Sequence, residues 1–222
     1  MTDNSMSGRA LCIFGCVFLC AGCIYNAEPM PAVVYDYGVS NSSARGPLHP
    51  VPVSGGGTVD VAGGVPWSWY PPAGVERGWT AIIIHHSGTD EGNTAIFDKW
   101  HRERNYWEGV GYDFVIGNGT DSGDGEVEVT FRWREQIQGA HCGGTAGNWA
   151  NEEGIGICLV GDFSKSSPTA RQMQSLVQLV RFLQQRYGIV SSRVFGHGST
   201  PGAHVTDCPG RNFSMWRLKR ML

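Results

Sequence analysis

The chain has 222 residues and a formal net charge of −3 at neutral pH, and its 32 glycines follow no regular period. This length is enough for one domain with a sizeable core plus attached segments. A slightly acidic balance does not suit a polyanion, so nucleic acid is not expected as a partner. The scattered glycines exclude a fibrous repeat and indicate loops and tight turns.

An apolar segment over residues 11–22 lies near the N-terminus. It is too short to cross a bilayer comfortably, and small residues close it directly before Cys23. We therefore expect a secretory signal over residues 1–23. Its end, Cys20-Ala21-Gly22-Cys23, resembles a bacterial lipobox, although Cys20 stands where leucine is usual. The expected product is an exported lipoprotein of the cell envelope, membrane-anchored at Cys23; an ordinary cleaved signal and an uncleaved anchor are the alternatives.

Residues 24–77 show no periodicity and are rich in proline and glycine. This composition is typical of an extended, largely disordered tether. Three aromatic residues near its end, Trp67, Trp69 and Tyr70, are candidates either for packing on the domain or for contact with glycan, and packing is the simpler use of such rings. We place the folded domain over residues 78–222.

The folded domain opens with a continuous β-branched run over residues 81–86, which predicts a strand buried on both faces. The run ends in His85 and His86, whose side chains point to opposite faces because side chains alternate along a strand. A helix is expected over residues 94–104, where apolar residues recur at helical spacing and Thr94 can cap the first turn.

Further elements follow in chain order: a strand over 111–116, an exposed polar hairpin over 120–128, a short strand over 131–134, a buried strand over 155–161, the clearest helix over 168–187, and an apolar segment over 189–195. The long helix carries an apolar stripe and ends at Gly188, and the stripe is explained by core packing without any cofactor. Short apolar strands mixed with helices indicate an α/β domain around one sheet.

Histidines and a cysteine follow several of these strands and are the candidate functional residues: His85 or His86, His141, His197, His204 and Cys208. A catalytic zinc site needs three protein ligands and an open position, and imidazole and thiolate both suit Zn²⁺. Ligands on strand ends and the loops after them can converge. No short motif such as His-Glu-x-x-His is present, so a set of unrelated core and loop histidines is the alternative.

Six segments, taken together in their order, resemble the type 2 family of zinc-dependent N-acetylmuramoyl-L-alanine amidases, which includes phage T7 lysozyme and the animal peptidoglycan recognition proteins. They are Ile-Ile-Ile-His-His-Ser at 82–87, Gly-Tyr-Asp-Phe at 111–114, Gly-Ala-His at 139–141, the strand at 155–161, Gly-His at 196–197 and Thr-Asp-Cys-Pro-Gly at 206–210. The resemblance covers roughly residues 78–222. It implies a single domain with a central mixed β-sheet flanked by α-helices.

The resemblance also implies the ligands of a Zn²⁺ ion. They fall on His85, His197 and Cys208, whereas His86 faces away from the metal. Catalytically inactive relatives lose ligands, notably the cysteine. All three are present here, which favours an enzyme over a recognition module.

Other positions of the family's site carry over less uniformly. Tyr112 matches the tyrosine that assists the zinc-bound water or the substrate carbonyl, and Thr206 stands where active animal relatives have a threonine. His141 is a candidate for the substrate groove, for orienting a ligand or for a structural role. A related branch has a glutamate where Cys158 aligns, so a carboxylate general base is in doubt. His204 has no role in the family pattern.

The implied activity is zinc-dependent hydrolysis of the amide bond between N-acetylmuramic acid and L-alanine, in intact peptidoglycan or in a muropeptide. The enzyme is expected to be a monomer. A non-catalytic peptidoglycan-binding protein would share the fold and is expected to lack a ligand. A structural envelope lipoprotein would fit the signal and tether but has no use for zinc ligands. A zinc hydrolase of another acyl-amide also remains open.

Overall fold

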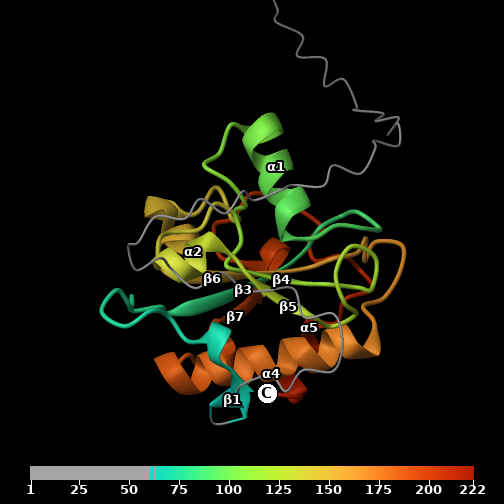
Figure 1. The fold of residues 1–222 in the computed structure, drawn as a ribbon. Coiled ribbons are helices and arrows are strands. Elements are labelled where there is room, and N and C mark those ends of the chain that lie inside the picture. Colours follow the sequence, from blue (N-terminus) through green and yellow to red (C-terminus); the bar gives the residue numbers. More distant parts are fainter. Residues whose placement is uncertain (1–60, 63) are drawn as a thin grey trace, which may run out of the picture. The chain divides into compact units, whose positions relative to one another are not determined.

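The structure is a computed structural model that describes residues 61–62 and 64–222, so the predicted signal and most of the predicted tether lie outside the described residues. A five-stranded sheet with strand order β5-β4-β6-β3-β7 forms the centre of this part (Figure 1). Its strands are β3 (Ala81–His86), β4 (Phe114–Ile116), β5 (Val127–Val129), β6 (Gly154–Leu159) and β7 (Val194–Gly196). A separate antiparallel pair joins β1 (Val61–Ala62) and β2 (Val65–Pro66).

The helices are α1 (Thr94–Asn105), α2 (Phe131–Glu135), α3 (Trp149–Glu152), α4 (Ala170–Tyr187) and α5 (Met215–Arg220). Single 3₁₀ turns occur at η1 (Trp67–Trp69), η2 (Ala146–Asn148), η3 (Ser191–Arg193) and η4 (His197–Ser199). No helix among the described residues is both long enough and apolar enough to serve as a membrane span.

The sheet is mixed, as the sequence predicts. Strand β3 pairs in parallel with β6 on one side and with β7 on the other, β4 pairs in parallel with β6, and only β5 runs antiparallel, at the edge. Within the sheet His85 stands opposite Cys158, and Ile84 stands opposite Gly196. Because β3 and β7 are adjacent and parallel, their carboxyl ends lie at one edge, and so do the residues that follow them.

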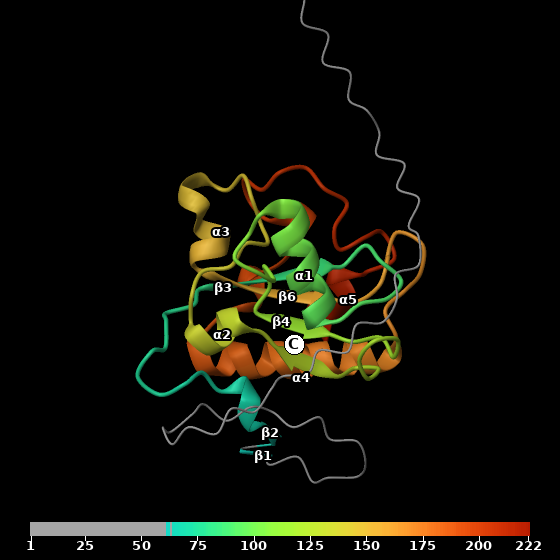
Figure 2. The same cartoon turned by 45° about the horizontal axis from the view of Figure 1, so that its top comes forward.

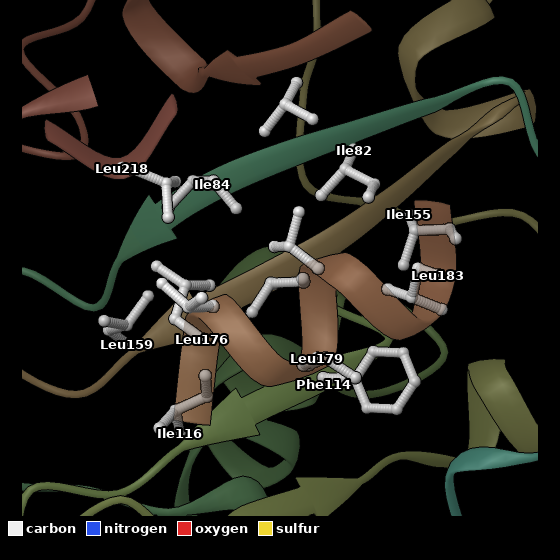
Figure 3. Packing of buried hydrophobic residues seen from close by; sticks show 14 of the residues in the cluster. Ile82, Ile84, Phe114, Ile116, Ile155, Leu159, Leu176, Leu179, Leu183 and Leu218 are labelled. Carbon is white, nitrogen blue, oxygen red and sulfur yellow. The ribbon is translucent and has the colours of Figure 1, made fainter. Parts of the chain in front are cut away.

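The two faces of the sheet are covered by different helices. Helix α4 runs along one face and α1 lies over the other (Figures 1 and 2). On the α4 side, side chains from β3, β4, β6, α4 and α5 form the main core (Figure 3): Ile82, Ile84, Phe114, Ile116, Ile155, Leu159, Leu176, Leu179, Leu183 and Leu218. On the other side, Phe97 of α1 packs with Val115 and Cys158. Alternation along the strands therefore gives the sheet two apolar faces.

Helix α4 has the sequence signals of a well-defined helix at both ends. Thr169 and Gln172 form a capping box, in which each side chain accepts a hydrogen bond from the other residue's backbone N–H. Gly188 ends the helix with a φ of 67°, a left-handed conformation that glycine adopts without a Cβ penalty. The predicted helix and its end are both confirmed.

Two local predictions are wrong. Helix α1 is capped by Asn93, whose side chain accepts from the Ile96 N–H, while the Thr94 N–H and hydroxyl both donate to Glu128. Residues 131–134, predicted as a strand, belong to helix α2. These residues alternate between aromatic and arginine side chains, which is typical of a strand with one exposed face. Arg132 is nevertheless buried beside Trp133, and its guanidinium donates to the carbonyls of Val110 and Gln138.

The boundary predicted at residue 77 is also wrong for the described part of the tether. Val65 and Trp69 are buried in the main core, and the Trp133 indole N–H donates to the Trp69 carbonyl. Farther along, the Glu76 carboxylate accepts two hydrogen bonds from the Arg186 guanidinium of α4. The segment from residue 64 to 77 is thus part of the folded domain, and proline and glycine content alone did not distinguish it from a tether.

Asp113 is a fully buried carboxyl group just before β4. One carboxylate oxygen accepts from the Gly156 N–H at 2.8 Å, and the other has no hydrogen-bond partner. Burial raises the pKa of Asp113 to about 7, well above its ordinary value. An unfolded chain releases this proton near pH 4, so the contribution of Asp113 to stability falls as pH rises from about 4 to about 7.

We expect Asp113→Asn to stabilise the protein increasingly over that pH range, by up to a few kcal/mol at neutral pH and above, because asparagine resembles the protonated acid. Denaturant unfolding of the variant and the parent chain between pH 4 and 8 measures the difference. Asp207→Asn, at an exposed site, is the control and should show no such growth. Parallel stability curves for Asp113→Asn and the parent chain would contradict the prediction.

Candidate metal centre

Three side chains that can bind a metal meet at the carboxyl edge of the sheet. His85 is the next-to-last residue of β3, His197 begins the turn directly after β7, and Cys208 lies in the loop that follows. One ligand atom from each lies within 4.8 Å of the others. The backbone N–H of Gly198 donates to the Cys208 carbonyl at 2.7 Å, which fastens the cysteine loop to the turn that carries His197.

The protonation states of these three residues suit a metal ion. Burial holds the pKa of His85 well below its usual value, with neighbouring histidines adding to the effect, and burial also lowers the pKa of His197. Both rings are therefore neutral at neutral pH and can offer a lone pair. Burial raises the pKa of the Cys208 thiol to about 12, against the opposing effect of the His86 N–H, which donates to the sulfur at 3.4 Å. A divalent cation supplies the charge that ionises such a thiol.

A chain of hydrogen bonds fixes which nitrogen of His85 faces the site. His141 Nε2 lies 3.3 Å from the Gly154 carbonyl oxygen, and His141 Nδ1 lies 3.0 Å from His85 Nε2. Because a carbonyl only accepts, Nε2 of His141 carries the proton, and its Nδ1 accepts from His85 Nε2–H. This leaves the lone pair on His85 Nδ1, the atom 3.7 Å from the Cys208 sulfur.

The surroundings of His141 bear on the three roles that its sequence position leaves open. The side chain is 7% exposed, and burial lowers its pKa to about 3, so the ring is neutral. Its ring lies against Gly139 and Gly156, where a Cβ atom on either glycine would overlap it. Burial and the bond to His85 favour the ligand-orienting role over the substrate groove, since orienting partners of this kind fix the tautomer of a metal-binding histidine.

Tyr112 and Thr206, the predicted catalytic pair, lie at this same edge. The ring of Tyr112 is centred 5.3 Å from that of His85. The Thr206 hydroxyl accepts from the Cys208 N–H at 3.2 Å and keeps its own proton for another acceptor. Both residues are thus donors placed next to the candidate ligands.

The remaining candidates are not members of this ligand set. His86 points away to the opposite face, where its Nδ1 accepts from the Phe163 N–H at 3.0 Å. His204 is exposed on the loop before Cys208. The His204 backbone N–H donates to the Gly143 carbonyl and so holds this loop to the neighbouring one. Cys142, Cys158 and Cys208 are all free thiols.

Sequence reasoning missed two groups of this site, the His86 N–H and the Gly154 carbonyl. Both belong to the backbone, so no residue type signals them, and only the pairing of β3 and the position of His141 reveal their roles.

A pocket of about 230 Å³ opens beside Tyr112, between α1 and the loop after β3. It is lined by Ser87, Thr89, Phe97, Trp100, His101, Arg104, Asn105 and Tyr112. A wider groove of about 1290 Å³ runs along α4, and none of the candidate ligands lines it. No candidate ligand lines the small pocket either, and Tyr112 is the residue of the predicted site that borders it.

The chain is similar in sequence to known proteins over the described domain. The family model described as N-acetylmuramoyl-L-alanine amidase matches residues 75–211. Peptidoglycan-recognition protein 2 of Holotrichia diomphalia is 25% identical over 150 residues, which cover 61% of this chain and 72% of that protein. The human N-acetylmuramoyl-L-alanine amidase is 28% identical over 120 residues, which cover 53% of this chain and only 18% of the human protein.

Solved structures agree with this relationship. The N-acetylmuramoyl-L-alanine amidase LysC from Clostridium intestinale URNW superposes with a TM-score of 0.55 at 28% identity, covering 70% of this chain and 93% of LysC. Bumblebee PGRP-SA shares the fold, at 24% identity and a TM-score of 0.51. The superposition covers 67% of this chain and 84% of the bumblebee protein. With the family model matching more than half of its length, the chain belongs to the type 2 N-acetylmuramoyl-L-alanine amidase family.

Proposed function

We propose that this protein is a zinc-dependent N-acetylmuramoyl-L-alanine amidase, which hydrolyses the amide bond between N-acetylmuramic acid and L-alanine in peptidoglycan or a muropeptide. The observation that carries the proposal is the complete ligand set of His85, His197 and Cys208, with atoms within 4.8 Å of one another. The family also includes recognition proteins that bind peptidoglycan, and a purely binding module has no need of three converging ligands. Peptidoglycan as substrate agrees with the export and lipid anchor predicted from residues 1–23.

Zinc fits this donor set better than other common metals. Two imidazoles and one thiolate suit Zn²⁺, whereas magnesium and calcium prefer oxygen ligands. Three protein ligands leave an open position, which is typical of catalytic rather than structural zinc. A zinc ion held there supplies Lewis-acid chemistry, since it lowers the pKa of a bound water and polarises a carbonyl oxygen.

The residues of the chain itself complete the reaction scheme. Hydrolysis of the lactyl amide places negative charge on the carbonyl oxygen in the transition state. We assign the stabilisation of that charge to the hydroxyls of Tyr112, whose ring lies beside that of His85, and of Thr206, which accepts from the Cys208 N–H. Burial raises the pKa of Tyr112 well above its ordinary value, so the phenol keeps its proton and remains a donor at neutral pH. His141 keeps the His85 lone pair directed toward the ligand set throughout.

Digestion of purified peptidoglycan by the full chain tests the proposal. We expect release of stem peptides that begin with L-alanine, loss of this release when a chelator removes the metal, and recovery when zinc is added back. Mass analysis of the soluble products identifies the bond that is cut. Sedimentation with the wall but no released peptide would instead support the binding-protein alternative.

Cys208→Ser should remove most of the bound zinc and at least about a hundredfold of the activity, because a hydroxyl is a far weaker zinc ligand than a thiolate. Zinc content by elemental analysis is the primary readout, with the melting temperature as a check of folding. Cys142→Ser, at a buried thiol outside the ligand set, is the matched control and should keep its zinc. Full zinc content in Cys208→Ser would show that this cysteine is not a ligand.

His141→Ala should weaken zinc binding about tenfold to a hundredfold, because His85 loses the partner that fixes its tautomer and ring orientation. Competition with a chromophoric chelator measures the affinity without any reference to activity. His204→Ala removes an exposed histidine of the same edge and serves as the control. Equal zinc affinities for His141→Ala and His204→Ala would assign His141 a purely structural role.

A further inference from the structure

Basic residues are concentrated in the C-terminal part of the chain. Residues 170–222 contain eight of the 17 lysines and arginines of the chain but only one of its 20 aspartates and glutamates, Asp207. This part includes α4 and α5, which share the main core through Leu218. A chain that is slightly acidic as a whole therefore has a strongly basic region, and such a charge asymmetry is typical of proteins that meet an anionic partner.

The groove along α4 lies in this basic region. Arg181 of α4 and Arg217 of α5 both line it, and neither forms an ion pair within the part of the chain that the structure describes. The charge of Arg186, a third arginine of the lining, is balanced by Glu76. Apolar side chains form another part of the lining: Met173, Val177, Phe182 and Met221. The groove thus combines an apolar surface with uncompensated positive charge.

Two tryptophans with exposed rings adjoin the groove. Trp216 of α5 is 68% exposed, and the Arg220 guanidinium lies over its ring, 4.7 Å from the centroid. These two residues share one side of the helix, away from the buried Leu218. Trp67 is 61% exposed, and its ring is centred 5.5 Å from that of Tyr70, which lines the groove. Exposed indoles next to basic side chains are typical of a surface that contacts the interfacial layer of a membrane.

We propose that the groove along α4 and the adjoining outer side of α5, together the α4–α5 surface, bind a bilayer that contains anionic phospholipid. Arg181, Arg217 and Arg220 then meet the lipid phosphates, and the Trp216 ring enters the interfacial layer. A hydrophilic polyanion would satisfy the arginines but would leave the exposed indoles without a partner, so the observations favour a bilayer. The inference does not depend on the proposed amidase activity.

The start of the described chain supports the same orientation. Gly64 and Val65, at the β1–β2 pair, line the groove, and the Gln178 side chain of α4 donates to the Gly64 carbonyl at 3.1 Å. The segment that leads back to Cys23, the predicted lipid anchor, therefore joins the domain beside the α4–α5 surface. One lipid chain gives only marginal attachment to a membrane, and a basic surface is the second signal that makes attachment stable.

The metal centre lies apart from this surface. None of its three ligands lines the groove. His85 stands opposite Cys158, whose side chain packs on the α1 side of the sheet, whereas α4 covers the other side (Figures 1 and 2). A bilayer against the α4–α5 surface therefore leaves the imidazole of His85 on the far side of the sheet.

Co-sedimentation of the full chain with vesicles tests the inference. The vesicles are phosphatidylcholine with and without phosphatidylglycerol. We expect the combined variant Arg181→Gln, Arg217→Gln and Arg220→Gln to bind the anionic vesicles at least about tenfold more weakly than the parent chain, because each arginine near an anionic surface adds to the attraction. High salt should reduce this difference by screening the charges.

The matched control removes the same charge elsewhere, by Lys99→Gln, Arg102→Gln and Arg134→Gln on α1 and α2. It should bind anionic vesicles like the parent chain. Both variants keep the apolar segment over residues 11–22, so any insertion of that segment adds equally to their binding. Melting temperatures confirm that both are folded. Equal affinities of the two variants for anionic vesicles would overturn the inference.

Fluorescence quenching by lipids with brominated acyl chains locates the contact on the protein. Trp216→Phe should reduce the quenched fraction of the tryptophan emission, whereas Trp107→Phe, at a 40% exposed residue after α1, should not. Equal quenching in the two variants would contradict insertion of α5. Arginine-dependent binding to soluble polyphosphate, with no quenching of Trp216 by vesicles, would assign the surface to a hydrophilic polyanion instead.

Discussion

The parallel pairing of β3 with both β6 and β7 is the constraint on which the metal centre depends. It brings the ends of two strands to one edge of the sheet, so that His85 and His197 meet although they are far apart in sequence. The same pairing places Cys158 beside His85 and presents the His86 N–H to the sulfur of Cys208. The apolar core between the sheet and α4 holds the strands in this register, because a slip by one residue would turn His85 toward that core and Ile84 toward the site.

Burial gives this site its chemical character. The same desolvation that keeps both imidazoles neutral also keeps the thiol of Cys208 protonated, so two of the ligands are ready for a cation and the third becomes ready only in its presence. Metal binding and proton release are therefore coupled in this centre. Acid competes for the same lone pairs, which makes metal retention sensitive to low pH.

The sequence predicted the parts of the molecule that depend on side-chain pattern. Continuous apolar runs gave β3 and β6, helical periodicity gave α4, and the opposite orientations of His85 and His86 followed from strand geometry alone. Predictions were wrong where tertiary contacts outweigh the pattern: buried Arg132 gave helix α2 the alternation of a strand, and Trp69 packs into the core from a segment whose composition resembles a tether. The convergence of the ligands came from the family resemblance, since spacing alone cannot show which loops meet.

Gly156 shows how far the requirements of this centre extend beyond its ligands. The His141 ring occupies the space above β6 that any side chain at this position would fill. Even an alanine there would displace the ring, and with it the partner that sets the tautomer of His85. Two chains with identical histidines and cysteine can therefore differ in metal competence through a single methyl group on the central strand. Relatives that keep the three ligands but lack this glycine are expected to have reorganised the support of their first histidine.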